Sequence, residues 1–198
     1  DNVSCSFESG KFYSILGQSG SGKTTLLSLL SGLDTIEEGD ILYNGESIKK
    51  IGYNKYRNSY VNIIFQSYNL IPYMTAYENV EVALDIAGIK LSKEDKKEKI
   101  LSTLNELGID NSAAFRTVLK LSGGEQQRVA IARCLVTDIP FIMADEPTGN
   151  LDEDTEKKII DIFKKLAKQG KGVIVVTHSK ELAESSDKIY HIKGGGVY

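Results

Sequence analysis

Near the start of the chain the sequence reads Gly17-Gln18-Ser19-Gly20-Ser21-Gly22-Lys23-Thr24. An apolar run at 12–16 precedes these residues and predicts a strand, and a helical pattern at 23–31 follows them. Glycines let the backbone curl so that successive N–H groups face one anion, and the helix N-terminus adds partial positive charge. Lys23 can reach outer phosphates and Thr24 suits Mg²⁺. This context predicts a phosphate-binding loop rather than an ordinary Gly/Ser-rich turn.

Outward from this loop, short apolar runs alternate with amphipathic stretches. The runs are nearly continuous in hydrophobicity, as expected for parallel strands buried on both faces. The predicted strands are 12–16, 61–65, 140–144 and 172–177. The predicted helices between them are 23–31, 125–135 and 152–168. The alternation of strands and helices predicts an α/β fold.

Two regions interrupt this alternation. From residue 75 to 119 only helical signals occur, with Ser92 as the expected N-cap of one helix, so we expect a helical insertion. After residues 40–42, the sequence Tyr43-Asn44-Gly45 is a turn signal. It predicts a small antiparallel piece beside the first helix.

Length and composition set outer limits on the class of protein. The chain has 198 residues, of which 41% are hydrophobic and 26% charged, and this fits one packed domain. Its net charge of −3 gives no overall basic field for nucleic acid, and no apolar run approaches the roughly 20 residues that cross a bilayer. Two cysteines indicate a reducing compartment. A reducing compartment fits a cytosolic protein. Because the chain starts at Asp1 without an initiator Met, we expect it to be truncated at its N-terminus.

Two acids follow the predicted strand at 140–144. In open parallel sheets, ligands bind beyond the carboxyl ends of the strands, which is where Asp145 and Glu146 emerge. Asp145 suits the shell of Mg²⁺, and Glu146 suits the polarisation of an attacking water. The alternative is a loop start with solvated acids. The phosphate-binding loop upstream favours the site.

The sequence Leu121-Ser122-Gly123-Gly124-Glu125 supports two interpretations. Ser122 with Glu125 three residues later is a capping box at the start of a helix. The same helix start is also an anion site, because a hydroxyl and two glycines permit close approach of the backbone to phosphate. Both interpretations can hold together.

Four motifs now stand in one order along the chain: residues 17–24, LSGGEQQR at 121–128, MADEPTGNLD at 143–152, and Thr177-His178. In this order they resemble the nucleotide-binding subunits of ATP-binding cassette (ABC) transporters. FQSYNLIP at 65–72 and ENV at 78–80 resemble, within that family, the bacterial group that serves lipoprotein release, macrolide export and antimicrobial-peptide export or resistance.

The resemblance implies a P-loop NTPase fold. Its parts are a RecA-like parallel-sheet core, an inserted helical subdomain and a partial antiparallel β subdomain, all within a single ABC ATPase domain at 1–198. The core would take residues 1–71 and 128–198, and the helical subdomain residues 72–127.

Site roles are carried over from the family by position. The residues implied to hold the phosphates of ATP are Gly17, Ser19, Gly20, Ser21, Gly22, Lys23, Thr24 and Thr25. The implied Mg²⁺ ligands are Thr24, Gln66 and Asp145. As catalytic residues, Glu146 would polarise the water, His178 would touch the γ-phosphate, and Gln66 would contact Mg²⁺ and the water. The loop that carries Gln66 would sense the membrane subunit. On residue type alone, a strand-end Gln is more often polar surface and a lone His is usually structural.

Partners are also implied by the resemblance. Two cassettes would pack head to tail, so that Ser122, Gly123 and Gly124 of one chain complete the ATP site of the other. Asp152 would communicate across that dimer, although it also fits an ordinary helix N-cap. A transmembrane permease would dock on the helical insertion and the Gln66 loop, which places the chain in the cytoplasm on the inner face of the membrane. No nucleic-acid partner is expected.

Two other functions stay open on the sequence. A cassette of this kind could transmit force to cell-wall or division machinery without transport. A nucleic-acid-associated ABC ATPase is disfavoured because no sustained heptads separate Lys23 from Ser122. Relatives usually carry an upstream strand with an aromatic residue that stacks on adenine, so we expect this chain to bind ATP weakly. No residue indicates the cargo.

Overall fold

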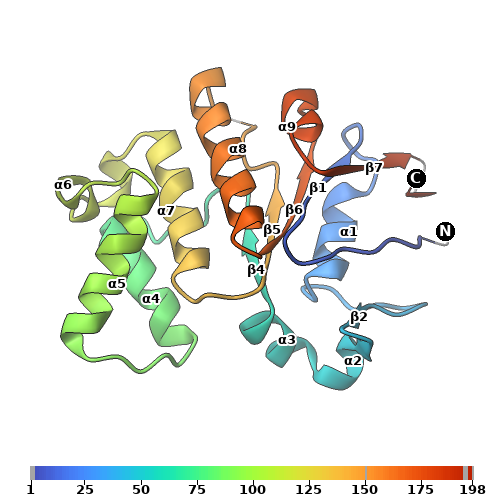
Figure 1. Cartoon of the computed structure of the whole chain (residues 1–198), viewed down its shortest axis with the longest axis horizontal. Helices are drawn as coiled ribbons and strands as arrows, with labels where there is room; N and C mark the ends of the chain where they lie inside the picture. Colours follow the sequence, from blue (N-terminus) through green and yellow to red (C-terminus); the bar gives the residue numbers. More distant parts are fainter. Residues whose placement is uncertain (1–2, 150, 194–195, 198) are drawn as a thin grey trace.

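A six-stranded sheet forms the centre of the molecule in a computed structural model that describes residues 3–149, 151–193 and 196–197 (Figure 1). Its strand order is β4-β5-β6-β1-β7-β8. The strands are β1 (Phe12–Leu16), β4 (Val61–Ile64), β5 (Phe141–Asp145), β6 (Gly172–Thr177), β7 (Lys188–Lys193) and β8 (Gly196–Val197). Neighbours from β4 to β7 pair in parallel, and only β8 runs antiparallel to β7. The four strands expected from apolar runs are confirmed: β1 and β6 have the predicted bounds, and β4 and β5 differ from them by one residue.

The strands bury both faces, as their continuous hydrophobicity predicts. Along β6, Val173 and Val175 belong to one hydrophobic core, whereas Ile174 and Val176 belong to a second core on the opposite face. The period of two follows from the alternation of side chains along a strand. The sheet therefore separates two layers of helices.

The first layer is the larger one. It contains α4 (Ala76–Ile86), α5 (Lys93–Glu106), α6 (Asn111–Ala114), the 3₁₀ turn η1 (Val118–Lys120), α7 (Gly123–Leu135) and α8 (Glu153–Lys168). The predicted helical insertion at 75–119 is confirmed, with one isolated bridge between Thr75 and Thr117 added to it. Ser92 caps α5 as predicted. The described part of the chain contains no helix long and apolar enough to cross a membrane.

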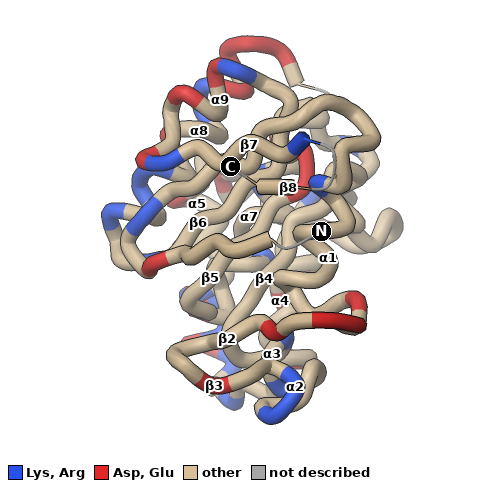
Figure 2. Tube along the Cα trace, turned by 90° about the vertical axis from the view of Figure 1, so that its right-hand side faces the viewer, with Lys and Arg blue, Asp and Glu red and all other residues tan. Residues whose placement is uncertain are grey.

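The second layer lies against the other face of the sheet. It is formed by α1 (Lys23–Leu30), the hairpin of β2 (Leu42–Tyr43) and β3 (Glu46–Ser47), and the short helices α2 (Ile48–Ile51) and α3 (Tyr53–Ser59). The last helix, α9 (Lys180–Glu184), follows β6. Asn44 and Gly45 both have positive φ, as a two-residue hairpin turn requires, so the predicted turn is confirmed. Figure 2 shows acidic and basic residues interspersed along the trace in that view, with basic residues on α2.

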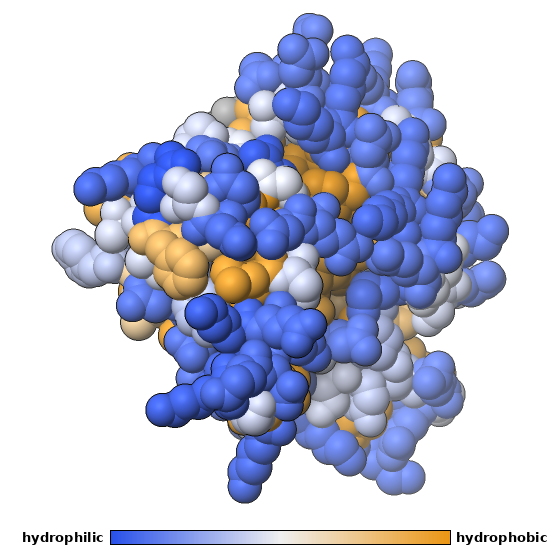
Figure 3. All heavy atoms as spheres, turned by 60° about the vertical axis from the view of Figure 1, so that its left-hand side comes forward, coloured by the Kyte–Doolittle hydropathy of each residue, from blue (hydrophilic) through white to orange (hydrophobic). Residues whose placement is uncertain are grey.

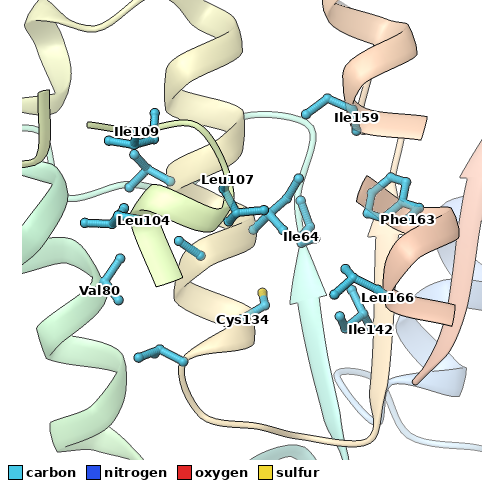
Figure 4. Packing of buried hydrophobic residues seen from close by; sticks show 14 of the residues in the cluster. Ile64, Val80, Leu104, Leu107, Ile109, Cys134, Ile142, Ile159, Phe163 and Leu166 are labelled. Atoms are coloured by element: carbon cyan, nitrogen blue, oxygen red, sulfur yellow. The ribbon is translucent and has the colours of Figure 1, made fainter. Parts of the chain in front are cut away.

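Helix α7 packs directly against β4 (Figure 4). The Cys134 side chain is buried between them, and its Sγ lies 3.7 Å from the Ile63 carbonyl oxygen. Asn62 of β4 donates from Nδ2 to the Cys134 carbonyl oxygen at 2.6 Å. Burial raises the pKa of the Cys134 thiol to about 12. Cys134 is thus a packing residue, as its apolar context suggests.

Candidate active site

The phosphate-binding loop connects β1 to α1. Gly20 and Gly22 have φ of 76° and 97°, a region that favours glycine, so the loop can turn sharply before the helix begins. Gly22 stands at the N-cap position and offers no side-chain hydrogen bond, and the first turn of α1 has no acidic residue. The first N–H groups of α1 therefore keep their capacity to bind an anion.

Gly17 and Ser21 illustrate how closely this loop is packed. A Cβ at Gly17 would lie 2.6 Å from Ile192 Cγ2 and 2.6 Å from Ser21 Oγ, so no side chain fits there. The buried Ser21 Oγ finds no hydrogen-bond partner among the described residues. An orphaned donor beside free helix N–H groups fits a phosphate oxygen. Ser19, Thr24 and Thr25 are exposed on the same loop and helix start.

Lys23 is almost fully buried, with a side-chain exposure of 7%. Its Nζ donates to the carbonyl oxygens of Gly17 at 2.8 Å and Gln18 at 3.0 Å. The same Nζ lies 3.7 Å from Glu146 Oε1. The ammonium group is therefore held by two carbonyl oxygens of the loop and by the Glu146 carboxylate. From this position it can exchange the carbonyl oxygens for phosphate oxygens.

The acid pair lies at the end of β5. Thr24 Oγ1 donates to Asp145 Oδ1 at 3.3 Å, which brings the two predicted Mg²⁺ ligands together. Burial raises the pKa of Asp145, and the neighbouring Glu146 charge raises it further. Two oxygen ligands suit Mg²⁺, which takes one or two carboxylates together with the phosphates of its substrate. Among the described residues no group of three His, Cys, Asp or Glu forms a cage for a metal.

Glu146 occupies a strained backbone position. Its φ of 45° is unusual for a residue with a side chain, and its N–H donates to the Val176 carbonyl oxygen at 2.9 Å. Such strain is stored at functional sites when the surrounding structure enforces it. The conformation aims the carboxylate at Lys23 and at His178 at once.

His178 follows the end of β6 and is joined to Glu146 twice. Its backbone N–H donates to Glu146 Oε2 at 3.2 Å, and its Nδ1 lies 2.8 Å from the same oxygen. The imidazole itself is 65% exposed, so it has room to turn toward a substrate. Lys23, Glu146 and His178, which are far apart in the sequence, are thus brought into one cluster.

Gln66 lies two residues after β4 and is exposed. Its Nε2 is 3.6 Å from the place that a Cβ of Gly149 would take, and Glu146 Cβ is 3.9 Å from that place. The amide is therefore on the Glu146 side of the site. Of the segment 149–152, Asn150 lies outside the described residues.

Ser122, Gly123, Gly124 and Asp152 form a second group. The Ser122 hydroxyl and the Glu125 carboxylate complete the predicted capping box of α7, and Asp152 caps α8 through the Thr155 N–H. Their hydrogen bonds stay within these two helix starts and do not reach the loop at 17–25. Helices α1 and α7 also lie on different faces of the sheet (Figure 1). Within one chain, the loop at 17–25 and this second group are therefore separate.

One contacting residue, Arg133, was not predicted from the sequence. Arg133, in the last turn of α7, donates to the carbonyl oxygens of Tyr68 and Asn69, which both have positive φ. This pair of bonds fixes the loop that carries Gln66 to the C-terminal end of α7. A positive side chain near a helix C-terminus is an ordinary feature, so no local pattern distinguishes Arg133.

A glycine-rich loop with an uncapped helix, and an acid pair at the end of a nearby parallel strand, define a P-loop nucleoside triphosphatase. A family model described as ABC transporter matches residues 1–149. The chain belongs to the ABC transporter family of ATP-binding cassettes, and it is an ABC cassette ATPase.

Three relatives illustrate the match. The chain is 53% identical to the uncharacterized ABC transporter ATP-binding protein YclH of Bacillus subtilis, over 94% of this chain and 82% of that protein. It is 39% identical to the macrolide export ATP-binding/permease protein MacB of Brucella melitensis, over 98% of this chain and 30% of that protein. A dimeric post-hydrolysis structure of the cassette MJ0796 of Methanocaldococcus jannaschii, bound to ADP and Pi, superimposes with a TM-score of 0.90 at 38% identity, over 99% of this chain and 87% of that chain.

Proposed function

We propose that this ATPase powers a bacterial exporter through a separate membrane permease, with a lipoprotein, a macrolide or an antimicrobial peptide as the class of cargo. The observation that carries the ATPase part of the proposal is the cluster in which Glu146 contacts both Lys23 and His178. MacB, whose name joins an ATP-binding part to a permease, supports the export role. The 65–72 and 78–80 segments support it by resemblance.

The chemistry assigned to this chain's own residues follows from charge and position. Lys23 exchanges the carbonyl oxygens of Gly17 and Gln18 for oxygens of the β- and γ-phosphates, where its charge offsets theirs. Glu146 accepts a proton from the water that attacks the γ-phosphate in line. His178, tethered to Glu146, turns toward the γ-phosphate.

Mg²⁺ would be held by Thr24 and Asp145, with Gln66 as a further ligand. When bound, it neutralises charge on the β- and γ-phosphates. The raised pKa of Asp145 reflects the cost of a partly buried carboxylate, which a cation would offset.

The loop at 17–25 and the group around Ser122 are separate within one chain, and this separation supports a head-to-tail dimer of cassettes. Each group would then be one half of a composite ATP site. In that arrangement Ser122, Gly123 and Gly124 of one chain would close over the ATP held by Lys23 of the other, and Asp152 would contact the partner. Several anionic oxygens would then be neutralised between two helix N-termini. Hydrolysis would place like charges across the interface, so the dimer would reopen.

A groove between α3, α4 and α7 supports docking of the permease on the helical insertion. It has a volume of about 270 Å³ and combines Ile63, Val82 and Ile86 with the charged side chains of Arg57 and Arg133. Ile86 is 74% exposed, which is unusual for a large apolar side chain. Figure 3 shows apolar patches between polar side chains on the side that carries these helices.

Arg133 lines this groove and also donates to the loop after Gln66. A permease bound in the groove could therefore shift Gln66 at the ATP site by displacing Arg133. The division into a core at 1–71 and 128–198 and a helical subdomain at 72–127 is part of the same proposal. So is a location in the cytoplasm on the inner face of the membrane.

The test is the variant Glu146→Gln. Loss of the catalytic carboxylate should lower ATP hydrolysis by about 10²- to 10⁴-fold while ATP remains bound. Light scattering should then show twice the monomer mass with Mg-ATP and the monomer mass without it. Glu181→Gln, which changes an exposed acid in the first turn of α9, is the matched control and should leave hydrolysis unchanged. A Glu146→Gln chain that hydrolyses ATP at the parent rate would refute the role of Glu146.

A further inference from the structure

We propose that Thr155 is a positioning residue that joins the start of α7 at Gly124 to the start of α8 at Asp152, so that both segments move as one body. Its catalytic consequence rests on the composite site of the proposed function. Its packing part concerns this chain alone. Thr155 lies in the first turn of α8 and takes no part in the cluster around Lys23 and Glu146.

The first observation is steric. A Cβ at Gly124 would lie 2.5 Å from Thr155 Cγ2, closer than real Cβ atoms come to non-bonded heavy atoms. Arg128 Nη1 would be 3.6 Å away on another side. Gly124 lies within the helix α7, so its backbone conformation does not require glycine. Inside this chain, therefore, it is Thr155 that excludes a side chain at position 124.

The second observation is a pair of hydrogen bonds. Thr155 N–H donates to Asp152 Oδ1 at 3.0 Å, and Thr155 Oγ1 donates to Asp152 Oδ2 at 2.8 Å. Both carboxylate oxygens of Asp152 are thus held by one residue. The Thr155 hydroxyl is also the main cause of the lowered pKa of Asp152. The orientation of this exposed carboxylate is therefore set by Thr155.

Gly123, the neighbour of Gly124, has more room for a side chain. A Cβ at Gly123 would lie 3.3 Å from the Tyr68 hydroxyl oxygen and 3.8 Å from Leu151 Cδ2. The nearer atom is the end of a side chain, so an alanine at 123 needs only a small shift. Gly123 is therefore open to a side chain within this chain, whereas Gly124 is closed by Thr155.

Because one side chain touches α7 and holds the cap of α8, a displacement of Gly124 is passed to Asp152 without any change in the rest of the sheet. Close-packed side chains transmit such displacements because interiors have few voids. In the proposed dimer, Gly124 faces the partner's ATP and Asp152 faces the partner chain. Thr155 would then make the two contacts form and break together.

The packing part is tested by thermal unfolding without ATP. Gly124→Ala should lower Tm by about 3–10 °C, as expected for overpacking in a chain of this size. Adding Thr155→Ser removes Cγ2 and keeps the hydroxyl, so the double variant should recover most of the loss. Gly123→Ala is the matched control, because Thr155→Ser should not raise its Tm. A Gly124→Ala chain with the parent Tm, or one that Thr155→Ser fails to restore, overturns the proposal.

The positioning part is tested by Thr155→Val and Thr155→Ser, since valine keeps the shape and serine keeps the hydroxyl. Titration of the Asp152 carboxyl carbon by NMR should show a pKa that returns toward its usual value in Thr155→Val and stays low in Thr155→Ser. In the Glu146→Gln background, Mg-ATP should produce less dimer with Thr155→Val than with Thr155→Ser.

An Asp152 titration that is the same in both variants overturns the positioning role. If the Glu146→Gln chain alone stays monomeric with Mg-ATP, the proposed composite site fails. The Tm and titration results then still decide whether Thr155 joins the two helix starts.

Discussion

Two helix starts in this chain resemble each other in sequence and differ in how their N–H groups are used. Helix α1 follows a glycine-rich loop, has no side-chain cap and no acid in its first turn. Helix α7 also begins with glycines, but Ser122 and Glu125 already satisfy part of its N-terminus through a capping box. The start of α1 has Lys23 beside it, held between the loop and Glu146.

Under the proposed function, the comparison separates a primary anion site at the start of α1 from a secondary one at the start of α7. An uncapped helix start gives up no hydrogen bond within the protein when it binds a phosphate, because its N–H groups have no side-chain partner. A capped start is stable by itself and offers only its hydroxyl and its glycine backbone. The first arrangement suits tight binding of ATP by one chain, and the second suits a contact that must be released in each cycle.

The largest effect is expected at the primary site. Lys23→Ala should weaken Mg-ATP binding by about 10- to 150-fold, the range for loss of a charge-assisted hydrogen bond. Calorimetric titration with Mg-ATP measures it. Lys168→Ala, an exposed lysine in the last turn of α8, serves as the control and should bind ATP like the parent. Equal affinities in the two variants would remove Lys23 from the primary site.

An intermediate effect is expected at the secondary site, where Ser122→Ala can be compared with Thr75→Ala. Both residues are the N-cap residues of capping boxes, Ser122 at the start of α7 and Thr75 at the start of α4. Each change should cost about 1 kcal/mol of stability, which lowers Tm by about 2–4 °C. Only Ser122→Ala should also reduce the Mg-ATP-dependent dimer of the Glu146→Gln chain. If both variants dimerise equally, Ser122 acts only as a cap.

The smallest effect concerns pH. Asp145 beside α1 has a raised pKa, whereas a backbone N–H of Ser122 lowers the pKa of Glu125 beside α7. As pH falls, Asp145 should therefore gain its proton at a higher pH than an ordinary aspartate and lose its capacity for Mg²⁺, whereas Glu125 should keep its charge to a lower pH than an ordinary glutamate. The raised pKa also means that Asp145 contributes less to stability as pH rises through it.

Asp145→Asn should accordingly be slightly more stable than the parent at neutral pH without ATP, and it should lose the Mg²⁺ dependence of ATP binding. Unfolding curves and ATP titrations from the ordinary Asp pKa of 3.8 up to neutral pH, with and without Mg²⁺, measure both effects. A variant less stable than the parent at neutral pH would contradict the assignment of a desolvation cost to Asp145.

The strands that are buried on both faces could be predicted, because their apolar runs are continuous. Strand β7 was missed since Lys188, His191 and Lys193 interrupt its apolar residues and are exposed. The short helices α2 and α3 were missed for a different reason. Each has a single fully buried residue, Ile48 or Tyr56, so no helical period develops.

Within the site, the residues that contact phosphate follow from local pattern, whereas the partners of Glu146 do not. Glu146 contacts His178 because β5 and β6 are neighbours in the sheet. The sequence of neither segment encodes the strand order, so this contact could not be predicted. The family resemblance provided both residues without providing their contact. The contact between Gly124 and Thr155 likewise depends on how α7 lies against α8, which no spacing encodes.

The burial of Cys134 between α7 and β4 makes its thiol a probe of how these two elements separate. Burial raises the pKa of this thiol to about 12, so very little thiolate is present at neutral pH, and the side chain is 5% exposed at the edge of the groove between α3, α4 and α7. Alkylation of Cys134 should therefore be slow while α7 packs against β4. The rate of alkylation, followed by mass spectrometry, would report how often α7 separates from β4 and whether ATP makes this separation rarer.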